Sequence, residues 1–463
     1  MMNISDIIIQ GDLNTLRDAL EGDVPLNEID DYGFTPLIQA AITNQIEAAQ
    51  LLLEKGASPN TPDLVDRTAL HWAADNHNED LCHLLLEYGA NPNAYTIGAQ
   101  PVLTFPLLYR YERIKQLLYA HGADFNFADD YINTKVIGHR YELKGVADIF
   151  CTPEKRFLEV EFEGFFIDVS VGLVFNALKH YCNHYATRPY RDCIPLIKKV
   201  VHALENARLL CKYKHYLTDY KKVTDSINQL LQAPLLILPV AYEGHAITFV
   251  KKGDYLAHCD RGEYSLEAGS TNIYYMKNPQ AFTIDFVKYL IYKKITKDFI
   301  QQDMHEYLGL ELRHQLPIKS QLSGNCSWAN VEAAFPAALF LLLQEEILPH
   351  SPSANKNLVL DVFHHWREWD KDVALNQCIQ QFYQASPPRK ATKAAILGAI
   401  LFQRCDYENR KDLRRAEKMM PVLTTPDYQY VLKSYIKTFW TDLKTKPGEN
   451  LMKILDICGI HLP

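Results

Sequence analysis

The sequence repeats with a period of 33 residues near its amino end. Gly56, Gly89 and Gly122 stand 33 residues apart, and each ends a helix-like segment: IEAAQLLLEKGASPN, EDLCHLLLEYGANPN and ERIKQLLYAHGADFN. A repeat of this length is one supersecondary unit, which buries its apolar face only against its neighbours. The amino-terminal part of the chain is therefore expected to form a stacked solenoid.

The same period extends to the residues that begin helices and end loops. It links Thr35 in GFTPLIQAA to Thr68 in RTALHWAA. It also recurs at the loop ends, at Asn27, Asn60, Asn93 and Asn126. A weaker first unit and a half unit after Asp130 bracket the full repeats as caps. This pattern resembles the ankyrin repeat over about residues 3–140, with about four repeats and a partial cap.

The ankyrin resemblance implies a surface that binds a protein and carries no chemistry of its own. By register, the candidate contact residues are Tyr32, Phe34, Trp72, Asn76, Tyr109 and Tyr111. Packing between repeats explains Trp72 and Tyr109 equally well, and His71 stands at the structural histidine position of the family. The loop asparagines serve turn geometry. In ankyrin families such positions are also substrates of asparaginyl hydroxylation, which makes Asn60, Asn93 and Asn126 candidate modification sites.

Composition excludes several classes of protein. The chain has 463 residues and a formal net charge of -8, which argues against direct nucleic-acid binding because that rests on a basic surface. Its ten cysteines include no Cys-x-x-Cys pair, so we expect a reducing compartment and neither a zinc ribbon nor a disulfide framework. No metal and no cofactor are expected.

The sequence predicts neither a secretory signal nor a membrane span. The amino terminus, MMNISDIIIQGD, has too short an apolar run for a signal peptide. The longest uncharged apolar run, at residues 333–343, is shorter than the about 20 residues that cross a membrane. We therefore expect a soluble monomer that makes no membrane contact.

The remaining two thirds of the chain lose the 33-residue period. Residues 157–171 alternate like a strand pair, and residues 192–232 are typical of a long helix or a helical pair. An antiparallel meander is predicted from short apolar runs at 235–242, 245–252, 254–260 and 271–277. Further helices are predicted at 281–294, at 299–308 and throughout the region after residue 349.

A cysteine opens a long apolar helix-like run in QLSGNCSWANVEAAFPAALFLLL. At the amino end of a helix the dipole lowers the pKa of a thiol, and a protonated histidine lowers it further, so Cys326 is a candidate nucleophile. Gln321 offers a side-chain amide that would hold an oxyanion together with the backbone N–H of Cys326. A buried structural cysteine is the simpler alternative.

A base and an orienting carboxylate are predicted in the meander. If strands 245–251 and 254–260 pair across a turn at Lys252 and Gly253, Asp260 lies opposite His245. A carboxylate in that place holds an imidazole in one tautomer, as a catalytic base requires. A packed strand histidine and a turn-capping aspartate are the alternative interpretations.

The chain order His, Asp, Gln, Cys resembles cysteine peptidases of the adenovirus-protease and SUMO-deconjugating type over about residues 235–345. Acetylating effectors of the YopJ type share that layout. The Asp-Cys-Gly box of those peptidases is replaced here by Asn325-Cys326-Ser327. A second resemblance, to papain-type enzymes, needs a histidine after the cysteine. His364 and His365 are the candidates, but they lie on a predicted helix, so His245 is preferred.

Together these patterns predict a multidomain α and α+β chain. We expect an ankyrin solenoid over residues 1–140, a cysteine-protease-like α/β domain with an antiparallel sheet over 141–350, and a helical subdomain packed on it over 351–463. This arrangement resembles the translocated ankyrin-repeat effectors of Legionella. The resemblance implies export by a type IV route and action in the host cytoplasm or nucleus.

Three functions remain open from the sequence. In the first, the repeats bind a host protein and the thiol site acts on it as a cysteine peptidase or isopeptidase. In the second, the same residues transfer an acyl group. In the third, the chain is a non-catalytic adaptor that perturbs a host complex.

Overall fold

The computed structural model describes residues 4–22, 24–212, 224–262, 271–321, 324–345 and 352–461. It divides into two compact units, each assembled from three stretches of the chain. Unit 1 contains Met1–Thr134, Val146–Glu161 and Gln384–Ile396, and unit 2 contains Lys135–Gly145, Phe162–Tyr383 and Leu397–Pro463. The domain boundaries expected at residues 140 and 350 stay predictions.

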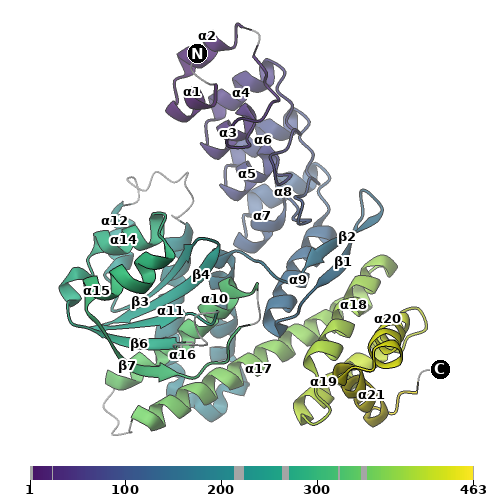
Figure 1. The fold of residues 1–463 in the computed structure, drawn as a ribbon. Coiled ribbons are helices and arrows are strands. Elements are labelled where there is room, and N and C mark those ends of the chain that lie inside the picture. The colour runs from purple at the N-terminus through teal and green to yellow at the C-terminus, as the bar shows by residue number, and fades with distance from the viewer. Residues whose placement is uncertain are drawn as a thin grey trace. The chain divides into compact units, whose positions relative to one another are not determined.

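Unit 1 begins with a stack of short helices. They are α1 (Ile4–Gln10), α2 (Leu13–Ala19), α3 (Pro36–Ile42), α4 (Ile46–Glu54), α5 (Ala69–Asp75), α6 (Glu79–Glu87), α7 (Thr104–Tyr109) and α8 (Glu112–Ala120). The first helices of successive repeats pack on one another, as do the second helices (Figure 1). The expected ankyrin solenoid is thereby confirmed.

Loop asparagines tie each repeat to the next. The Oδ1 atoms of Asn27, Asn60 and Asn93 accept hydrogen bonds at 2.7 Å from backbone N–H groups in the following repeat. The Nδ2 atoms of Asn60 and Asn93 also donate to the carbonyl oxygens of Gly89 and Gly122, at 2.9 and 2.8 Å. Both glycines have a positive φ, which explains why glycine recurs at this position of the repeat.

His71 has a structural role, as its position predicts. Its Nδ1 atom accepts a hydrogen bond from the backbone N–H of Thr68 at 3.1 Å, which caps α5, and its Nε2 atom lies 3.4 Å from the carbonyl oxygen of Gln100 in the next repeat. Burial, with the nearby charge of Arg67, lowers the pKa of His71 to about 3. The imidazole is therefore neutral at physiological pH.

The last layer of unit 1 is built from segments far apart in the sequence. It contains most of α9 (Phe125–Tyr141), the antiparallel hairpin of β1 (Val146–Cys151) and β2 (Arg156–Glu161), and the first half of α18 (Pro387–Arg404). The carboxylate of Asp130, which is completely buried, pairs with Arg389 at 2.6 Å and with Lys393 at 2.8 Å. A late helix thus neutralises a charge at the end of the solenoid.

Unit 2 contains a five-stranded antiparallel sheet in the order β3-β4-β5-β6-β7. The strands are β3 (Leu235–Tyr242), β4 (His245–Lys252), β5 (Tyr255–Cys259), β6 (Thr271–Met276) and β7 (Leu310–Leu316). The first four confirm the predicted meander. The fifth strand, β7, was not predicted, because its run LELRHQL carries charged side chains on an edge strand of the sheet.

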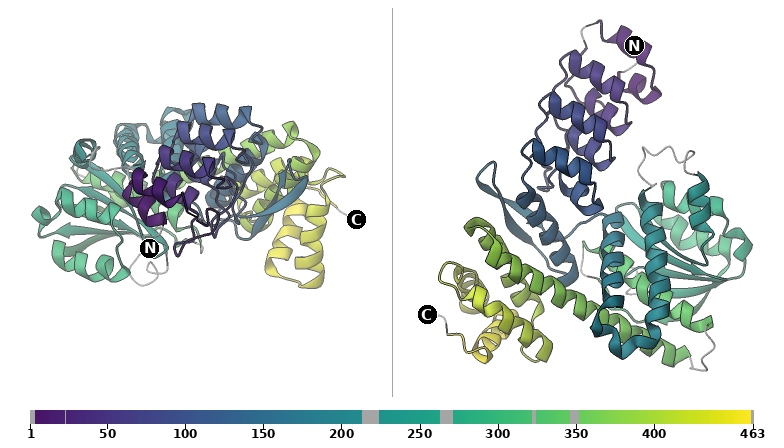
Figure 2. Two further views of the ribbon diagram at one scale, coloured as in Figure 1. Left: turned by 90° about the horizontal axis from the view of Figure 1, so that it is seen from above. Right: turned by 180° about the vertical axis from the view of Figure 1, so that it is seen from behind.

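Helices cover both faces of this sheet (Figure 2). One face packs on α10 (Ile167–Asn183), α11 (Ile194–Lys212) and α16 (Cys326–Glu345), and the other on α12 (Thr224–Leu231), α14 (Ile284–Tyr292) and α15 (Met304–Leu308). Short 3-10 or π-helical turns join some of these elements: η1 (Tyr185–Cys193), η2 (Pro279–Ala281) and η3 (Phe299–Asp303). The strand pair expected at 157–171 is wrong, because only its first part is strand β2 and its end begins α10.

Helix α16 is the core helix of unit 2. By length and composition it could cross a membrane, but its side chains are buried between α10, α11 and the sheet. Burial inside the unit therefore accounts for its apolar composition. The chain continues through α17 (Pro352–Gln384), the second half of α18, α19 (Arg410–Leu423), α20 (Tyr430–Tyr435), η4 (Ile436–Asp442) and α21 (Lys446–Ile457), as the predicted helical region requires.

Replacing Asp130 tests the last layer of unit 1. We expect Asp130→Ala to lower the free energy of unfolding by about 3 kcal/mol, because it leaves two cations without their shared buried carboxylate. Asp129→Ala is the matched control, since Asp129 lies 3.5 Å from Arg389 and is partly exposed, and it is expected to cost less than about 1 kcal/mol. Urea unfolding of the full chain measures both, and equal losses would contradict the assignment.

Candidate active site

Cys326 is the first residue of α16, and its side chain is only partly buried. The preceding loop is held against residues 163 and 164: the backbone N–H of Gly164 donates to the carbonyl oxygen of Gly324 at 3.0 Å. Gly324 has a φ of 78°, and a Cβ atom there would lie 2.9 Å from the Cβ of Glu163. The chain therefore needs glycine two residues before the thiol.

His245 and Asp260 are in direct contact, although not through the predicted register. Strand β5 pairs with β4 so that Cys259 lies opposite Thr248, which shifts the pairing by two residues from the expected one. His245 and Asp260 still meet because a shift of two keeps both side chains on the same face of the sheet. The Nε2 atom of His245 lies 3.0 Å from Oδ1 of Asp260.

The imidazole of His245 also forms a hydrogen bond with the thiol of Cys326. Burial acts to lower the pKa of His245, but the bonds to Asp260 and Cys326 outweigh it and raise that pKa to about 9. Burial acts to raise the pKa of Cys326, but the bonds from His245 and from the backbone of Ala246 and Ser327 lower it overall. Both shifts favour an imidazolium–thiolate pair over a neutral thiol and imidazole.

Asp260 is held as a carboxylate. Burial acts to raise its pKa, but the bond with His245 and the bond from the backbone N–H of Gly262 lower it overall. A Cβ atom at Gly262 would lie 2.9 Å from Cε1 of His245 and 3.0 Å from Oδ1 of Asp260. Glycine is therefore required beside the pair, and sequence reasoning did not identify that role.

Asn330 joins the two strand ends to the helix that carries the sulfur. It lies one helical turn after Cys326 and is completely buried. Its Nδ2 atom donates to the carbonyl oxygen of Ala246, and its Oδ1 atom accepts from the backbone N–H of Arg261, both at 2.6 Å. Those two residues directly follow His245 and Asp260, so one carboxamide fixes the positions of both.

A buried network of four charges lies next to the site. Arg261 is completely buried and pairs with Glu142 at 3.0 Å and with Glu332 at 3.2 Å. Arg367 pairs with the same two glutamates, each at 3.1 Å. Two arginines and two glutamates balance in charge, so the network anchors the residue after Asp260 without adding net charge.

Gln321, predicted to hold an oxyanion, is attached to the same region. Its backbone N–H donates to the carbonyl oxygen of Arg261 at 2.8 Å. Within the described part of the chain, the buried Oε1 atom of Gln321 and the buried Oδ1 atom of Asn325 have no hydrogen-bond partner. These two oxygens are acceptors, whereas an oxyanion needs a donor, so the oxyanion role of Gln321 stays a prediction.

The alternative histidines and cysteines lie in other environments. His365 is bonded through Nδ1 to the hydroxyl of Tyr181 at 2.7 Å, on helix α17, and His364 is on the same helix. Burial raises the pKa of seven thiols in the described part of the chain: Cys82, Cys151, Cys182, Cys193, Cys259, Cys405 and Cys458. Cys326 differs from these because its histidine partner outweighs burial.

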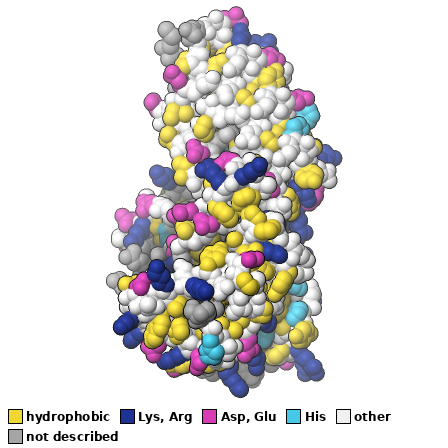
Figure 3. Space-filling model, turned by 90° about the vertical axis from the view of Figure 1, so that its right-hand side faces the viewer, with side chains coloured by type: hydrophobic (Ala, Val, Ile, Leu, Met, Phe, Trp, Pro, Cys, Tyr) yellow, Lys and Arg dark blue, Asp and Glu magenta, His cyan; other side chains and the backbone are white. Residues whose placement is uncertain are grey.

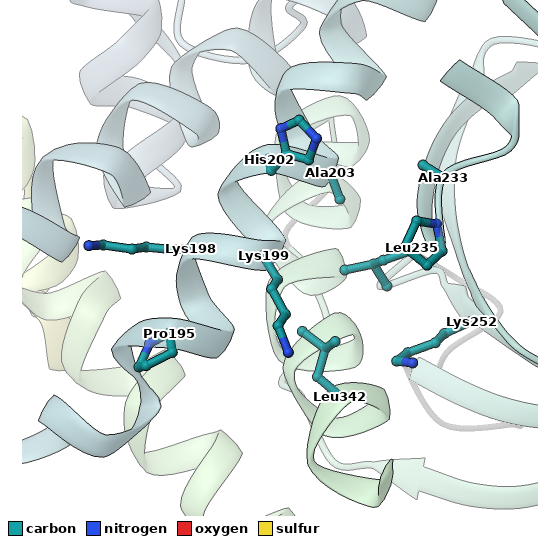
Figure 4. A pocket seen from close by; sticks show the side chains of 10 residues that line it. Pro195, Lys198, Lys199, His202, Ala203, Ala233, Leu235, Lys252 and Leu342 are labelled. Atoms are coloured by element: carbon teal, nitrogen blue, oxygen red, sulfur yellow. The ribbon is translucent and has the colours of Figure 1, made fainter. Parts of the chain in front are cut away.

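The described residues contain no cluster of metal ligands, and a separate cavity lies apart from this thiol. No group of three potential ligands among histidine, cysteine, aspartate and glutamate comes together in the described residues. A cavity of about 480 Å³ lies at the far end of the sheet, lined by residues such as Leu235, Lys252 and Leu342 (Figure 4). Leu342 is near the carboxyl end of α16, so this cavity is separate from the thiol at the amino end.

The candidate contact residues of the repeats divide by environment. Tyr32 is 69% exposed, whereas Trp72 is buried, with its ring below the guanidinium of Arg67. Asn76 donates to the carbonyl oxygen of Ala41 at 3.2 Å and so joins two repeats. The remaining three are partly buried: Phe34, Tyr109 and Tyr111. Tyr109 and Tyr111 stack with ring centroids 5.6 Å apart.

The candidate hydroxylation sites are engaged within the fold. Asn60 and Asn93 make the bonds between repeats described above, and Oδ1 of Asn126 accepts from Arg389 at 2.8 Å. All three residues are also at the protein surface. Their modification stays a prediction.

The pairing of Cys326 with His245 predicts that alkylating reagents modify Cys326 selectively. We expect iodoacetamide to modify Cys326 at pH 7 faster than the buried cysteines, and the rate to fall as pH decreases through the lowered thiol pKa. His245→Ala removes the group that lowers this pKa and should slow the reaction about tenfold or more. Peptide mass spectrometry measures the rates. His365→Ala is the control, and equal slowing by both variants would contradict the pairing.

Replacing Asn330 is expected to affect both the stability of the protein and the alkylation of Cys326. Asn330→Ala leaves the carbonyl of Ala246 and the N–H of Arg261 without this partner, so we expect a loss of about 2–4 kcal/mol in stability. Asn330→Asp keeps an acceptor for Arg261 but places a buried carboxylate oxygen against the carbonyl oxygen of Ala246, so it should not recover the loss. Alkylation of Cys326 should slow in folded Asn330→Ala protein. An unchanged alkylation rate would show that Asn330 does not position the site.

Comparisons with known proteins identify the repeats independently. Residues 5–96 match the family model for ankyrin repeats in three copies. Inversin of Danio rerio is 36% identical over 70 residues, which is 15% of this chain and 7% of inversin. The human DNA-binding protein RFXANK is 42% identical over 60 residues, 13% of this chain and 23% of that protein. The chain thus spans less than a quarter of either relative.

A solved structure matches the whole chain. The structure of the Legionella effector AnkH is 45% identical in sequence, with a TM-score of 0.87. The match covers 100% of this chain and 98% of that chain. Both the repeats and the unit that contains Cys326 are therefore included in the similarity. The chain belongs to the AnkH family of ankyrin-repeat effectors.

Proposed function

We propose that this effector is a cysteine peptidase or isopeptidase that acts on a protein bound by its ankyrin repeats. The observation that carries the proposal is the position of His245, which bonds to Asp260 and to Cys326 and has its pKa raised to about 9. Ankyrin repeats bind protein partners, and the family assignment supports action as an effector in a host cell. A type IV route and a cytoplasmic or nuclear site of action are part of the proposal.

The mechanism follows from the charges of the site. The Cys326 thiolate attacks the carbonyl carbon of the scissile bond, and the resulting oxyanion is held by the backbone N–H of Cys326 and the amide of Gln321. The His245 imidazolium then gives its proton to the leaving amine, and a thioester remains on Cys326. His245, now neutral, takes a proton from water, which attacks the thioester and releases the acid.

Asp260 positions the base and does not take up the proton. Its carboxylate contacts Nε2 of His245 at 3.0 Å and stabilises the imidazolium that is present before each attack. Asn330 and the network around Arg261 keep the strands that carry His245 and Asp260 in place.

Acyl transfer is a second candidate, because the same site would form a thioester with an acyl donor and pass the acyl group to an amine instead of water. The features described here do not depend on which nucleophile accepts the acyl group. The repeats alone support a third candidate, a non-catalytic adaptor. The partly buried thiol beside an imidazolium favours chemistry over an adaptor, because an adaptor has no need of a thiolate.

Replacing Cys326 distinguishes these candidate functions. We expect extracts of host cells treated with the full chain to gain new protein amino termini, or free isopeptide-linked modifiers, and Cys326→Ala to abolish this gain. Proteomic labelling of amino termini and of Gly-Gly remnants measures both. Cys458→Ala is the control. Acyl-CoA-dependent mass gain that requires Cys326 would indicate transfer.

A non-catalytic adaptor would respond to these replacements in the opposite way. If Cys326→Ala kept every measured change in the treated extracts while Tyr32→Ala removed it, the proposed peptidase would be wrong. Partner binding that survives Cys326→Ala is expected in either case, since the repeats lie in unit 1 and the thiol in unit 2.

A further inference from the structure

A polar cavity of about 480 Å³ lies in unit 2, apart from the candidate active site. It is formed by the end of α9, the middle of α17, the end of α18 and the start of α19. Its lining residues are Tyr141, His364, Glu368, Lys371, Arg404, Asn409, Arg410, Lys411, Asp412 and Arg415. Neither Cys326 nor its partners line this cavity, so the proposed peptidase chemistry does not account for it.

Part of the charge in this cavity is neutralised by the protein. Arg415 pairs with Glu368 at 2.9 Å, with Asp412 at 3.0 Å and with Asp372 at 2.7 Å. Lys371 pairs with Glu368 at 3.1 Å. These two cations and three carboxylates form a closed cluster, and they leave no positive charge in excess within it.

Three further cations line the cavity, and the structure pairs none of them with a carboxylate among the described residues: Arg404, Arg410 and Lys411. Arg404 is partly buried and donates from Nη2 to the backbone carbonyl of Glu142, while its buried Nε atom has no hydrogen-bond partner in the described residues. Arg410 and Lys411 are exposed at the mouth. The carbonyl oxygen of Glu142 takes one of the five guanidinium donors of Arg404, so other donors remain for an anion in the cavity.

The cavity also receives the amino end of a helix. Helix α19 has 14 residues, and Asn409 caps it by accepting a hydrogen bond from the backbone N–H of Lys411 at 2.9 Å. The positive end of the helix dipole adds to the charges of Arg410 and Lys411, which are in its first turn. Side-chain and backbone donors thus converge from α18 and α19.

We propose that this cavity binds a compact anion with two or more phosphate groups. Phosphate fits better than a single carboxylate because a planar guanidinium, an ammonium and a helix amino end each donate to separate phosphate oxygens. The three unmatched cations balance the charge of such a ligand. Asp412 shares the first turn of α19 with Arg410 and Lys411, but Arg415 neutralises it, so the ligand is expected to contact Arg404, Arg410 and Lys411.

A soluble small molecule is the expected source, and a nucleic-acid backbone is not. The chain has a formal net charge of -8, and on the face shown in Figure 3 basic side chains are interspersed with acidic ones. The cavity is also within the usual volume range of small-molecule sites, about 300–1,000 Å³. Among the described residues, the cavity near Leu342 is lined by Lys198, Lys199 and Lys252 but by no arginine.

Calorimetric titration of the full chain with inorganic tripolyphosphate tests the proposal. Tripolyphosphate is expected to bind at least about tenfold more tightly than sulfate at the same ionic strength, because it meets several donors at once. The double variant Arg410→Glu with Lys411→Glu should weaken tripolyphosphate binding about tenfold or more. The matched control is Arg414→Glu with Lys418→Glu, which reverses two exposed charges on the same helix outside the cavity and should change binding less than about twofold.

Arg404→Met provides a second test, in which the buried donor is removed and the exposed charges remain. It should also weaken tripolyphosphate binding, provided that circular dichroism shows a folded protein. Equal binding of sulfate and tripolyphosphate, or equal effects of the two double variants, would overturn the proposal. Tight binding of a single-stranded RNA oligonucleotide that displaces tripolyphosphate would assign the cavity to a nucleic acid instead and would also overturn it.

Discussion

One carboxamide holds the candidate active site together. Asn330 accepts from the backbone at Arg261 and donates to the backbone at Ala246, so a single side chain on α16 fixes the strand residues beside Asp260 and His245. The thiol lies at the start of the same helix. The electrostatic pairing of imidazole and sulfur is short-range, and it exists only while three separate elements keep this geometry.

The arginines and glutamates behind Asp260 extend that support deep into unit 2. Arg261 and Arg367 share Glu142 and Glu332, and the four residues lie just after α9, just after β5, on α16 and on α17. An uncompensated charge at this depth would be strongly unfavourable, so the four elements are constrained to assemble together. The site is therefore supported by elements that are distant in the sequence.

The sequence predicts the features that have a local signal. The 33-residue period reveals the ankyrin repeats, and alternation with turn residues reveals the first four strands of the sheet. Residue type and chain order predicted that His245, Asp260 and Cys326 lie together, and an error of two residues in the strand register left that prediction intact because it preserved the face of the sheet. Asn330 was missed, although a lone asparagine inside the apolar run of α16 is an available signal. Glu142 and Arg261 are 119 residues apart, and no periodicity relates them.

Unit 1 is assembled from segments that are distant in the sequence, and this affects how such proteins evolve. The solenoid ends on Asp130, whose cationic partners Arg389 and Lys393 are encoded about 260 residues later. Recombination that exchanged only the amino-terminal third of the gene would separate this acid from its counterions. New binding specificities are therefore more readily acquired by substitutions on the repeat surface than by wholesale replacement of the repeats.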